Sequence, residues 1–188
     1  NLDQFWDYYW KDGKNDKLGW RLDYNMRHRG DVYATHGLGP VAQALNIHRG
    51  DRMKTLVAMD TKSIVGKSLV EQRTDSVCNN FRNGDHTTTL IRTESGKVIE
   101  IQHNVMTPQP YNRLYQLTGT KGFANKYPTQ GYALSADQLT ASGIQPQVDN
   151  LSAHGFMPKA EQDALVEKYR HPILKKYGEM AKEVGGHG

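Results

Sequence analysis

One alternating stretch constrains the fold of this chain more than any other feature. The segment HTTTLIRTESGKVIEIQHNVM, residues 86–106, places β-branched and apolar residues on both sides of ESGK, which carries a glycine suited to a turn. Such a pattern is typical of two antiparallel strands joined in a hairpin. We therefore predict strands at 86–93 and 98–106.

Helical patterns lie on both sides of this hairpin. A helix is predicted at 32–46, where apolar residues recur at the i, i+3, i+4, i+7 spacing of one buried stripe: Leu38, Val41, Ala42 and Leu45. From Pro158 onward the apolar period is helical again, and Pro172 should break or kink that helix.

Further strands are expected at 52–61 and 111–119, with a loop and a short helix over 62–85. The fold class that follows is α+β, an open and mostly antiparallel β-sheet with flanking helices, over a single domain at 1–188. Residues 86–119 should form one antiparallel sheet. One of its faces should be apolar and covered by helices, and the other broad and available to another subunit.

Composition excludes several classes of protein. The net charge is +4 over 188 residues and no long basic run occurs, which disfavours nucleic-acid binding. The apolar runs fall short of the roughly 20 residues of a membrane span. Cys78 is the single cysteine, so an internal disulfide is excluded.

The segment GDVYATHGLGPVAQALN, residues 30–46, carries the first candidate site. Tyr33 and His36 lie one helical turn apart, and their side of the predicted helix is about 130° from its apolar stripe. Gly37 beside them leaves the backbone open to close approach by another molecule. A purely structural alternative stays open, in which Tyr33 and His36 pack on each other and HGLG marks a crowded helix crossing.

Other candidates are weaker. Asp31 fits a helix N-cap, and His103 alternates in phase with isoleucines, as a core histidine would. GLGPVA lacks the preceding strand that a phosphate-binding turn needs. No metal site is predicted, because the remaining histidines lack ligand spacing: His86, His154, His171 and His187.

Three quoted segments resemble a known family. GWR at 19–21, VYATHGLGPVAQALNIHRGDRM at 32–53 and QHNVMTPQPYNRLYQLTGTKGFANKYP at 102–128 are similar to glycoside hydrolase family 109. This is the family of NAD-dependent α-N-acetylgalactosaminidases, within the glucose–fructose oxidoreductase and inositol dehydrogenase superfamily. The resemblance is to the C-terminal, substrate-side domain, and the last 55 residues match only in general character.

Two departures qualify the resemblance. The glycine fingerprint of the superfamily's Rossmann domain is not in this sequence, so a fragment is expected whose NAD is bound by a missing N-terminal domain. No cofactor-binding residue is therefore assigned here. Many members carry an aspartate four residues before the motif histidine, whereas this chain has Val32, as in the hydrolase branch.

The resemblance implies a redox-assisted glycosidase. In such enzymes NAD oxidises C3 of the sugar, the C2 proton becomes acidic, the glycosidic group is eliminated, water adds and the hydride returns. By position, His36 and Tyr33 match the catalytic, sugar-contacting residues, and Arg21 a further sugar contact. A later tyrosine of that set aligns with Tyr111, or else with Tyr115.

Three functions remain open at this point. The leading one is the sugar-binding half of an α-N-acetylgalactosaminidase that acts on a carbohydrate substrate and forms a homo-oligomer through the sheet. The second is the substrate domain of a sugar or cyclitol dehydrogenase. The third is a non-catalytic carbohydrate-binding or oligomerisation domain. The compartment is left open, although bacterial relatives are often exported.

Overall fold

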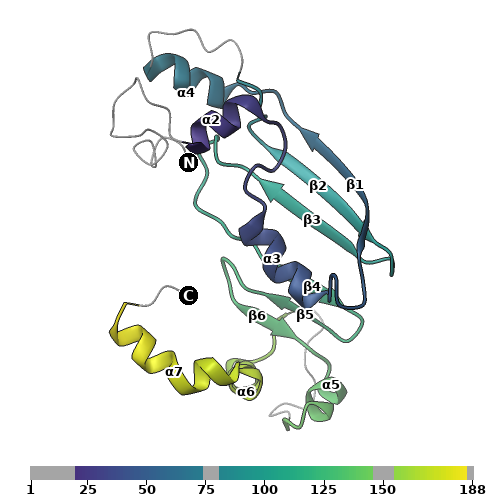
Figure 1. The fold of residues 1–188 in the computed structure, drawn as a ribbon. Helices are drawn as coiled ribbons and strands as arrows, with labels where there is room; N and C mark the ends of the chain where they lie inside the picture. The colour runs from purple at the N-terminus through teal and green to yellow at the C-terminus, as the bar shows by residue number, and fades with distance from the viewer. Residues whose placement is uncertain (1–19, 74–80, 146–154, 186–188) are drawn as a thin grey trace. The chain divides into compact units, whose positions relative to one another are not determined.

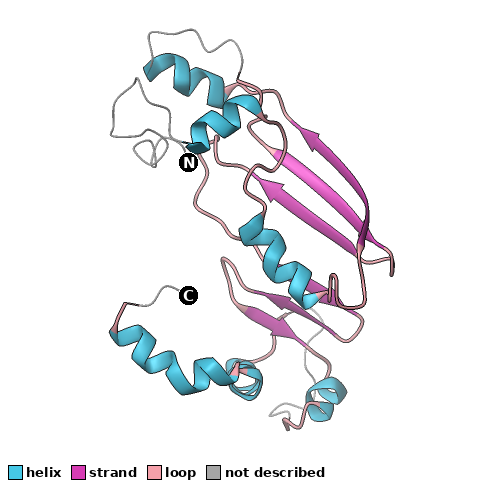
Figure 2. Ribbon diagram, in the orientation of Figure 1, coloured by secondary structure: helices cyan, strands magenta, loops and turns pink. Residues whose placement is uncertain are grey.

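The computed structural model describes residues 20–73, 81–145 and 155–185 (Figure 1). These residues form two compact units, Asn1–Tyr111 and Asn112–Gly188, and each unit contains its own small antiparallel sheet (Figure 2). The predicted α+β class is confirmed. Whether all 188 residues work as one substrate-binding domain stays a prediction.

The first unit contains a three-stranded antiparallel sheet with the strand order β1-β2-β3. Within the described residues, two helices precede β1 and one lies between β1 and β2. In chain order the elements are α2 (Trp20–Arg27), α3 (Thr35–Ala44), β1 (Met53–Asp60), α4 (Val65–Arg73), β2 (Thr87–Thr93) and β3 (Val98–His103). The predicted hairpin at 86–106 is confirmed as β2 and β3, and the strand at 52–61 as β1.

The register gives this sheet two different faces. Thr87 opposes His103 and Ile91 opposes Ile99, so these four residues lie on one face, which we call the inner face. Most inner-face residues of β2 and β3 are buried, and α3 packs against β3. The opposite, outer face carries exposed apolar side chains: Val57, Met59, Leu90 and Val98.

Beyond the end of the sheet, α2 and α4 enclose an apolar core of four buried side chains: Leu22, Val70, Phe81 and Met106. The start of α4 is fixed by Asp85, whose carboxylate accepts hydrogen bonds of 2.9 Å from the backbone N–H groups of Ile64, Val65 and Gly66. The first backbone N–H groups of a helix have no acceptor within the helix, and this carboxylate accepts their hydrogen bonds. Its negative charge is also stabilised by the positive end of the helix dipole.

Asp51 lies in the connection between α3 and β1 and forms hydrogen bonds with the turn of the β2–β3 hairpin. Its carboxylate accepts hydrogen bonds from Ser95 N at 3.1 Å and Lys97 Nζ at 2.9 Å, and also from the Ser95 hydroxyl. These bonds, that of the Ser95 hydroxyl first, hold the pKa of Asp51 below its usual range although burial opposes them. The C-terminal end of α3 is therefore held beside the sheet.

The second unit contains a three-stranded antiparallel sheet with the order β4-β5-β6. Its elements are β4 (Gln116–Gly119), β5 (Gly122–Asn125), β6 (Gly131–Ala133), α5 (Ala136–Ala141), α6 (Lys159–Tyr169) and α7 (Pro172–Glu183). The Phe156 ring stacks on Phe123 with a centroid distance of 6.2 Å. A Cβ on Gly131 would lie only 2.4 Å from that Phe156 ring, so glycine is required there.

The predicted helical period after Pro158 is confirmed, with its break at Pro172. Proline begins α7, where its missing N–H has no helical partner to lose. The apolar stripe of α7 is exposed and consists of Ile173, Tyr177 and Met180, followed by the exposed Val184 at the C-cap. None of the helices in the described residues is long and apolar enough to cross a membrane.

One strand prediction is wrong in its pairing. Residues 86–119 do not form a single sheet, because β4 pairs with β5 and belongs to the second unit. β4 also begins only at Gln116, after a connection that contains Pro108 and Pro110. Proline cannot donate to a ladder, so this segment leaves the sheet.

Candidate functional site

The helix that bears the first candidate residues begins later than predicted. α3 starts at Thr35, and Ala34 stands at its N-cap without a side-chain hydrogen bond, so the prediction of Asp31 as N-cap is wrong. Asp31 instead accepts a 3.0 Å hydrogen bond from Tyr33 N and closes a turn before the helix. Tyr33 therefore lies on this turn, and His36 lies in the first turn of α3.

The two sides of α3 differ as the sequence predicts. The stripe residues Leu38, Val41, Ala42 and Leu45 are half-buried, whereas Tyr33, His36, Gly37 and Pro40 are exposed. A Cβ built on Gly37 or Gly39 would meet nothing within 4 Å in the described part of the chain. A crowded helix crossing between described residues therefore does not explain HGLG, and open space lies beside His36.

Pro40 adds a second peculiarity to this exposed side. It lies inside α3 and cannot donate the hydrogen bond that residue 40 would give to the carbonyl of His36. The backbone next to His36 is thus less completely hydrogen-bonded by its own helix than elsewhere. Together with the glycines, it leaves polar backbone close to the exposed imidazole.

The structure brings Tyr33 and His36 into direct contact. Their rings stack with a centroid distance of 4.9 Å and an interplanar angle of 26°. The Thr35 hydroxyl lies 3.4 Å from His36 Nδ1, within hydrogen-bonding range. Tyr33 is 41% exposed, so the pair presents a phenol and an imidazole to whatever approaches this side of α3.

A buried amide network connects this segment to α2. Asn83 is fully buried, and its Oδ1 accepts a 3.0 Å hydrogen bond from Gly30 N. Its Nδ2 donates to Asn25 Oδ1 at 2.8 Å. Asn83 therefore holds the start of the Tyr33 segment beside the helix that carries Arg21.

An ion pair fixes the same connection on its exposed side. Arg29 donates from Nε to Asp60 Oδ2 at 2.9 Å and from Nη2 to Asp60 Oδ1 at 2.6 Å. The hydrogen bond from Arg29 is the largest effect holding the pKa of Asp60 below its usual value. Two parallel hydrogen bonds between a guanidinium and a carboxylate fix the orientation of both groups in addition to pairing their charges. The residues before Tyr33 are therefore held at the end of β1.

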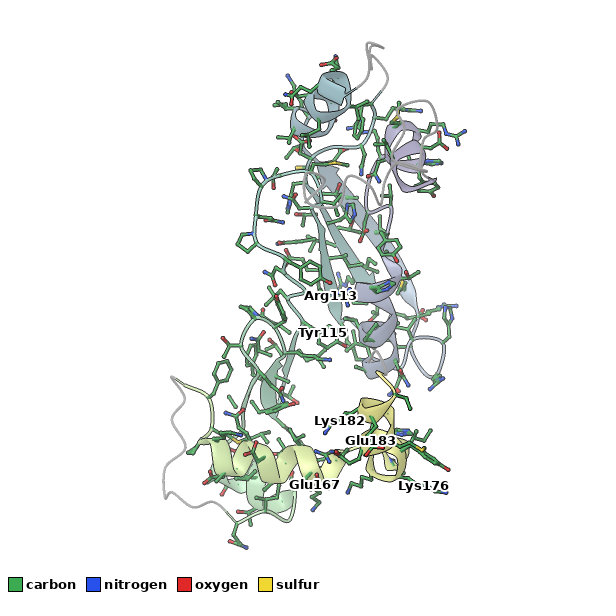
Figure 3. All side chains as sticks on the ribbon, turned by 90° about the vertical axis from the view of Figure 1, so that its left-hand side faces the viewer. Arg113, Tyr115, Glu167, Lys176, Lys182 and Glu183 are labelled. Atoms are coloured by element: carbon green, nitrogen blue, oxygen red, sulfur yellow. The ribbon has the colours of Figure 1, made fainter. Side chains whose placement is uncertain are left out.

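The other predicted sugar contacts are distributed over both units. Arg21 lies in α2, and its side chain is outside the described part of the structure. Tyr111 is exposed on the connection after β3. Tyr115 directly precedes β4 in the second unit, where burial raises its pKa (Figure 3). Whether Arg21, Tyr111 or Tyr115 faces the Tyr33–His36 pair stays a prediction.

The described residues do not fit a dinucleotide. A phosphate-binding glycine turn follows a strand and opens a helix, whereas GLGP lies inside α3 and follows a turn. Among the described residues no three His, Cys, Asp or Glu side chains gather in a way that could hold a metal ion. The candidate site in the described residues is the exposed, stacked pair of Tyr33 and His36.

Comparison with known proteins gives the family. Residues 7–188 match the family described as Glycosyl hydrolase 109, C-terminal domain. This chain belongs to that family. The resemblance seen in the sequence is thereby confirmed for nearly the whole chain, including its last 55 residues.

Proteins similar to this family 109 domain occur in Phocaeicola vulgatus and Porphyromonas gingivalis. Glycosyl hydrolase family 109 protein 4 of Phocaeicola vulgatus is 84% identical over 188 residues, which are 100% of this chain and 36% of that relative. The family 109 protein of Porphyromonas gingivalis is 56% identical over 188 residues, 100% of this chain and 38% of that relative. The chain thus spans a little over a third of the length of these curated relatives.

Proposed function

We infer that this domain is the sugar-binding half of a glycosidase that removes terminal α-N-acetylgalactosamine by an NAD-dependent route. Membership of family 109 supports a role in glycoside hydrolysis. The proposed substrate and NAD-dependent route rest on one observation, the stacked Tyr33–His36 pair on an exposed, glycine-flanked side of α3. This pair offers proton carriers, whereas ordinary glycoside hydrolysis uses two carboxylates.

Each residue has one task in this proposal. Thr35 lies at His36 Nδ1, so His36 Nε2 is the nitrogen assigned to the C3 hydroxyl of the sugar, where it holds or takes up a proton. The Tyr33 hydroxyl orients the sugar or shares that proton. Arg21 holds hydroxyl or acyl oxygens through its planar fork. A tyrosine of the later segment, Tyr111 or Tyr115, completes the contacts.

NAD, when bound by the remainder of the full-length protein, supplies the transient oxidation of the sugar that makes this chemistry possible. Product analysis on the full-length enzyme tests the proposal. With an α-N-acetylgalactosaminide, free sugar should accumulate while NADH does not. Oxidised sugar with a stoichiometric rise in NADH would instead identify a dehydrogenase.

The isolated 188-residue chain is expected to bind no NAD in calorimetry, because its described residues form no glycine-rich strand-to-helix turn for a pyrophosphate. The full-length protein, titrated in parallel, should bind NAD and serves as the control. Micromolar binding of NAD by the isolated chain would contradict the assignment of the cofactor to the rest of the protein.

Self-association through the outer face of the β1–β3 sheet is also part of this proposal. Met59 on that face is 77% exposed, beside exposed Val57 and Leu90. Met59→Lys should weaken association about tenfold or more, because a buried interface does not tolerate an unpaired charge. Light scattering over a concentration series measures it.

Met180→Lys, on exposed α7, is the matched control and should leave association unchanged. A wild-type protein that stays monomeric at high concentration would contradict an interface on this face.

A further inference from the structure

One buried side chain links the two stretches of chain that carry the proposed sugar contacts of the first unit. Asn83 is fully buried and contacts both α2 and the segment that follows α2. Gly30 N can only donate a hydrogen bond, so the oxygen of the Asn83 amide must face it, at 3.0 Å. The amide nitrogen then faces Asn25 Oδ1, to which it donates at 2.8 Å. Each end of one amide therefore contacts a different stretch of chain.

On the α2 side, backbone contacts accompany that of the side chain. Asn83 N donates to the Asn25 carbonyl at 3.1 Å, and Arg82 N donates to the Met26 carbonyl at 3.1 Å. Both carbonyls lie in the last turn of α2, where carbonyl groups find no N–H donor within the helix. Asn25 follows Arg21 by about one helical turn. Asn83 is therefore bonded to α2 about one turn from Arg21.

On the other side, the Asn83 amide holds a glycine at which the chain changes direction. Gly30 has a φ of +100°, a conformation that residues with a side chain rarely adopt. Because glycine has no side chain to pack, its place is fixed by contacts of its backbone, and the bond to Asn83 is one of them. Tyr33 lies in the turn that follows and stacks on His36. The position of Gly30 therefore determines where this pair begins.

The segment that carries Asn83 is itself fixed by its neighbours. A Cβ on Gly84 would lie only 2.3 Å from the backbone oxygen of Thr61, so this segment passes the end of β1 at close range. His86 N donates to Thr61 Oγ1 at 3.0 Å, and the Asp85 carboxylate accepts hydrogen bonds from the start of α4. Asn83 is thus anchored to β1 and α4, and the two stretches that it contacts are held to one anchor.

An apolar side chain would fill the same interior space without the cost of burying polar atoms. An amide adds direction, because its oxygen and its nitrogen fix the distance and orientation of the groups that they contact. We propose that Asn83 is a positioning residue of the sugar site, which sets the spacing between Arg21 on α2 and His36 at the start of α3. This role rests on the proposed function, because only there do these two residues contact one sugar.

A double-mutant cycle on kcat/KM in the full-length enzyme tests this role. Asn83→Ala should lower kcat/KM by about 10²-fold, because a misplacement of roughly 1 Å can cost that much. The factor lost on Arg21→Ala should be about fivefold smaller in the Asn83→Ala background than in wild type, because the sugar is no longer held by both stretches at once. Equal factors in the two backgrounds would overturn the proposal, since a smaller folded fraction lowers every rate alike.

Thr93→Val is the matched control for Asn83→Ala. Thr93 is also buried, and its hydroxyl accepts a 3.1 Å hydrogen bond from Lys97 N. It opposes Met53, at the other end of β1 from Asn83. The substitution should lower stability but leave kcat/KM of the folded enzyme and the Arg21→Ala factor unchanged. An equally reduced Arg21→Ala factor in Thr93→Val would show general loosening and overturn the role of Asn83.

Asn25→Ala tests the same link from α2 and does not depend on the folding of Asn83→Ala. Alanine favours the helix, and the bond between Asn83 and Gly30 N remains. The factor lost on Arg21→Ala should again be about fivefold smaller than in wild type. An Arg21→Ala factor of wild-type size in folded Asn25→Ala would contradict the proposed spacing role.

Amide hydrogen exchange separates this inference from the proposed function. In the full-length protein, the peptide that contains Gly30 should exchange about tenfold faster in Asn83→Ala than in wild type, whether or not the enzyme hydrolyses a glycoside. Faster exchange in a protein without glycosidase activity would remove the proposed function and leave the hold of Asn83 on this segment. Exchange at the wild-type rate would overturn the role of Asn83.

Discussion

Replacing His36 by alanine in the full-length enzyme is expected to lower kcat by about 10²- to 10⁴-fold, with a smaller effect on KM. The reason is that a positioned acid or base acts in the transition state, where it contributes about 3–5 kcal/mol. Arg21→Ala should act mainly on KM, because a side chain that holds the sugar in ground and transition states alike contributes uniform binding. Steady-state kinetics on both variants measures the difference.

The chain offers a matched control for His36. His28 is also an exposed histidine stacked on a tyrosine of its own segment, with a centroid distance of 3.8 Å to Tyr24. His28→Ala removes a similar stack and should leave kcat unchanged. A His36→Ala enzyme that melts earlier but turns over normally in its folded fraction would show that the Tyr33–His36 pair is only structural.

Leu22→Ala is expected to destabilise the protein by about 2–5 kcal/mol. Leu22 is fully buried and packs with Val70, Phe81 and Met106, so alanine would leave a cavity between α2 and α4. Because Leu22 follows Arg21 directly, loosening this helix should also weaken sugar binding by the full-length enzyme. Urea unfolding followed by circular dichroism measures the loss of stability.

Leu174→Ala is the control for this variant. Leu174 also lies in a helix, α7, but is 59% exposed, so its removal leaves no cavity and should change stability by less than about 0.5 kcal/mol. Equal effects of the two substitutions would contradict the core assigned to the first unit.

The elements that depend on local pattern could be predicted from the sequence. The hairpin of β2 and β3 follows from β-branched residues around ESGK, and the α3 stripe follows from apolar spacing. The exposure of His36 follows from the same spacing, because helical residues away from the stripe face away from the sheet, whereas Tyr33 lies on the turn before α3. Local chemistry fixes these features without knowledge of distant contacts.

Pairing and long-range polar contacts could not be predicted in this way. The residue pattern of 111–119 predicted a strand, which is β4. It did not show that β4 pairs with β5 rather than with β3. Asn83 contacts residues 53 and 58 positions away in the sequence, and no spacing rule connects them.

Short elements of mixed polarity were also missed. α2, β5 and α5 have 8, 4 and 6 residues, too few for a clear apolar period. Tertiary packing decides such segments, as it does for α2 through the burial of Leu22 and Asn25.

The most direct measurement of the central claim is the deuterium content at C2 of the sugar that the full-length enzyme releases in heavy water. The proposed route removes the C2 proton and later returns one from solvent, whereas hydrolysis by two carboxylates never breaks the C2–H bond. NMR of the released N-acetylgalactosamine should therefore show deuterium at C2 with no net production of NADH. Released sugar that keeps its C2 proton throughout the reaction would contradict the account.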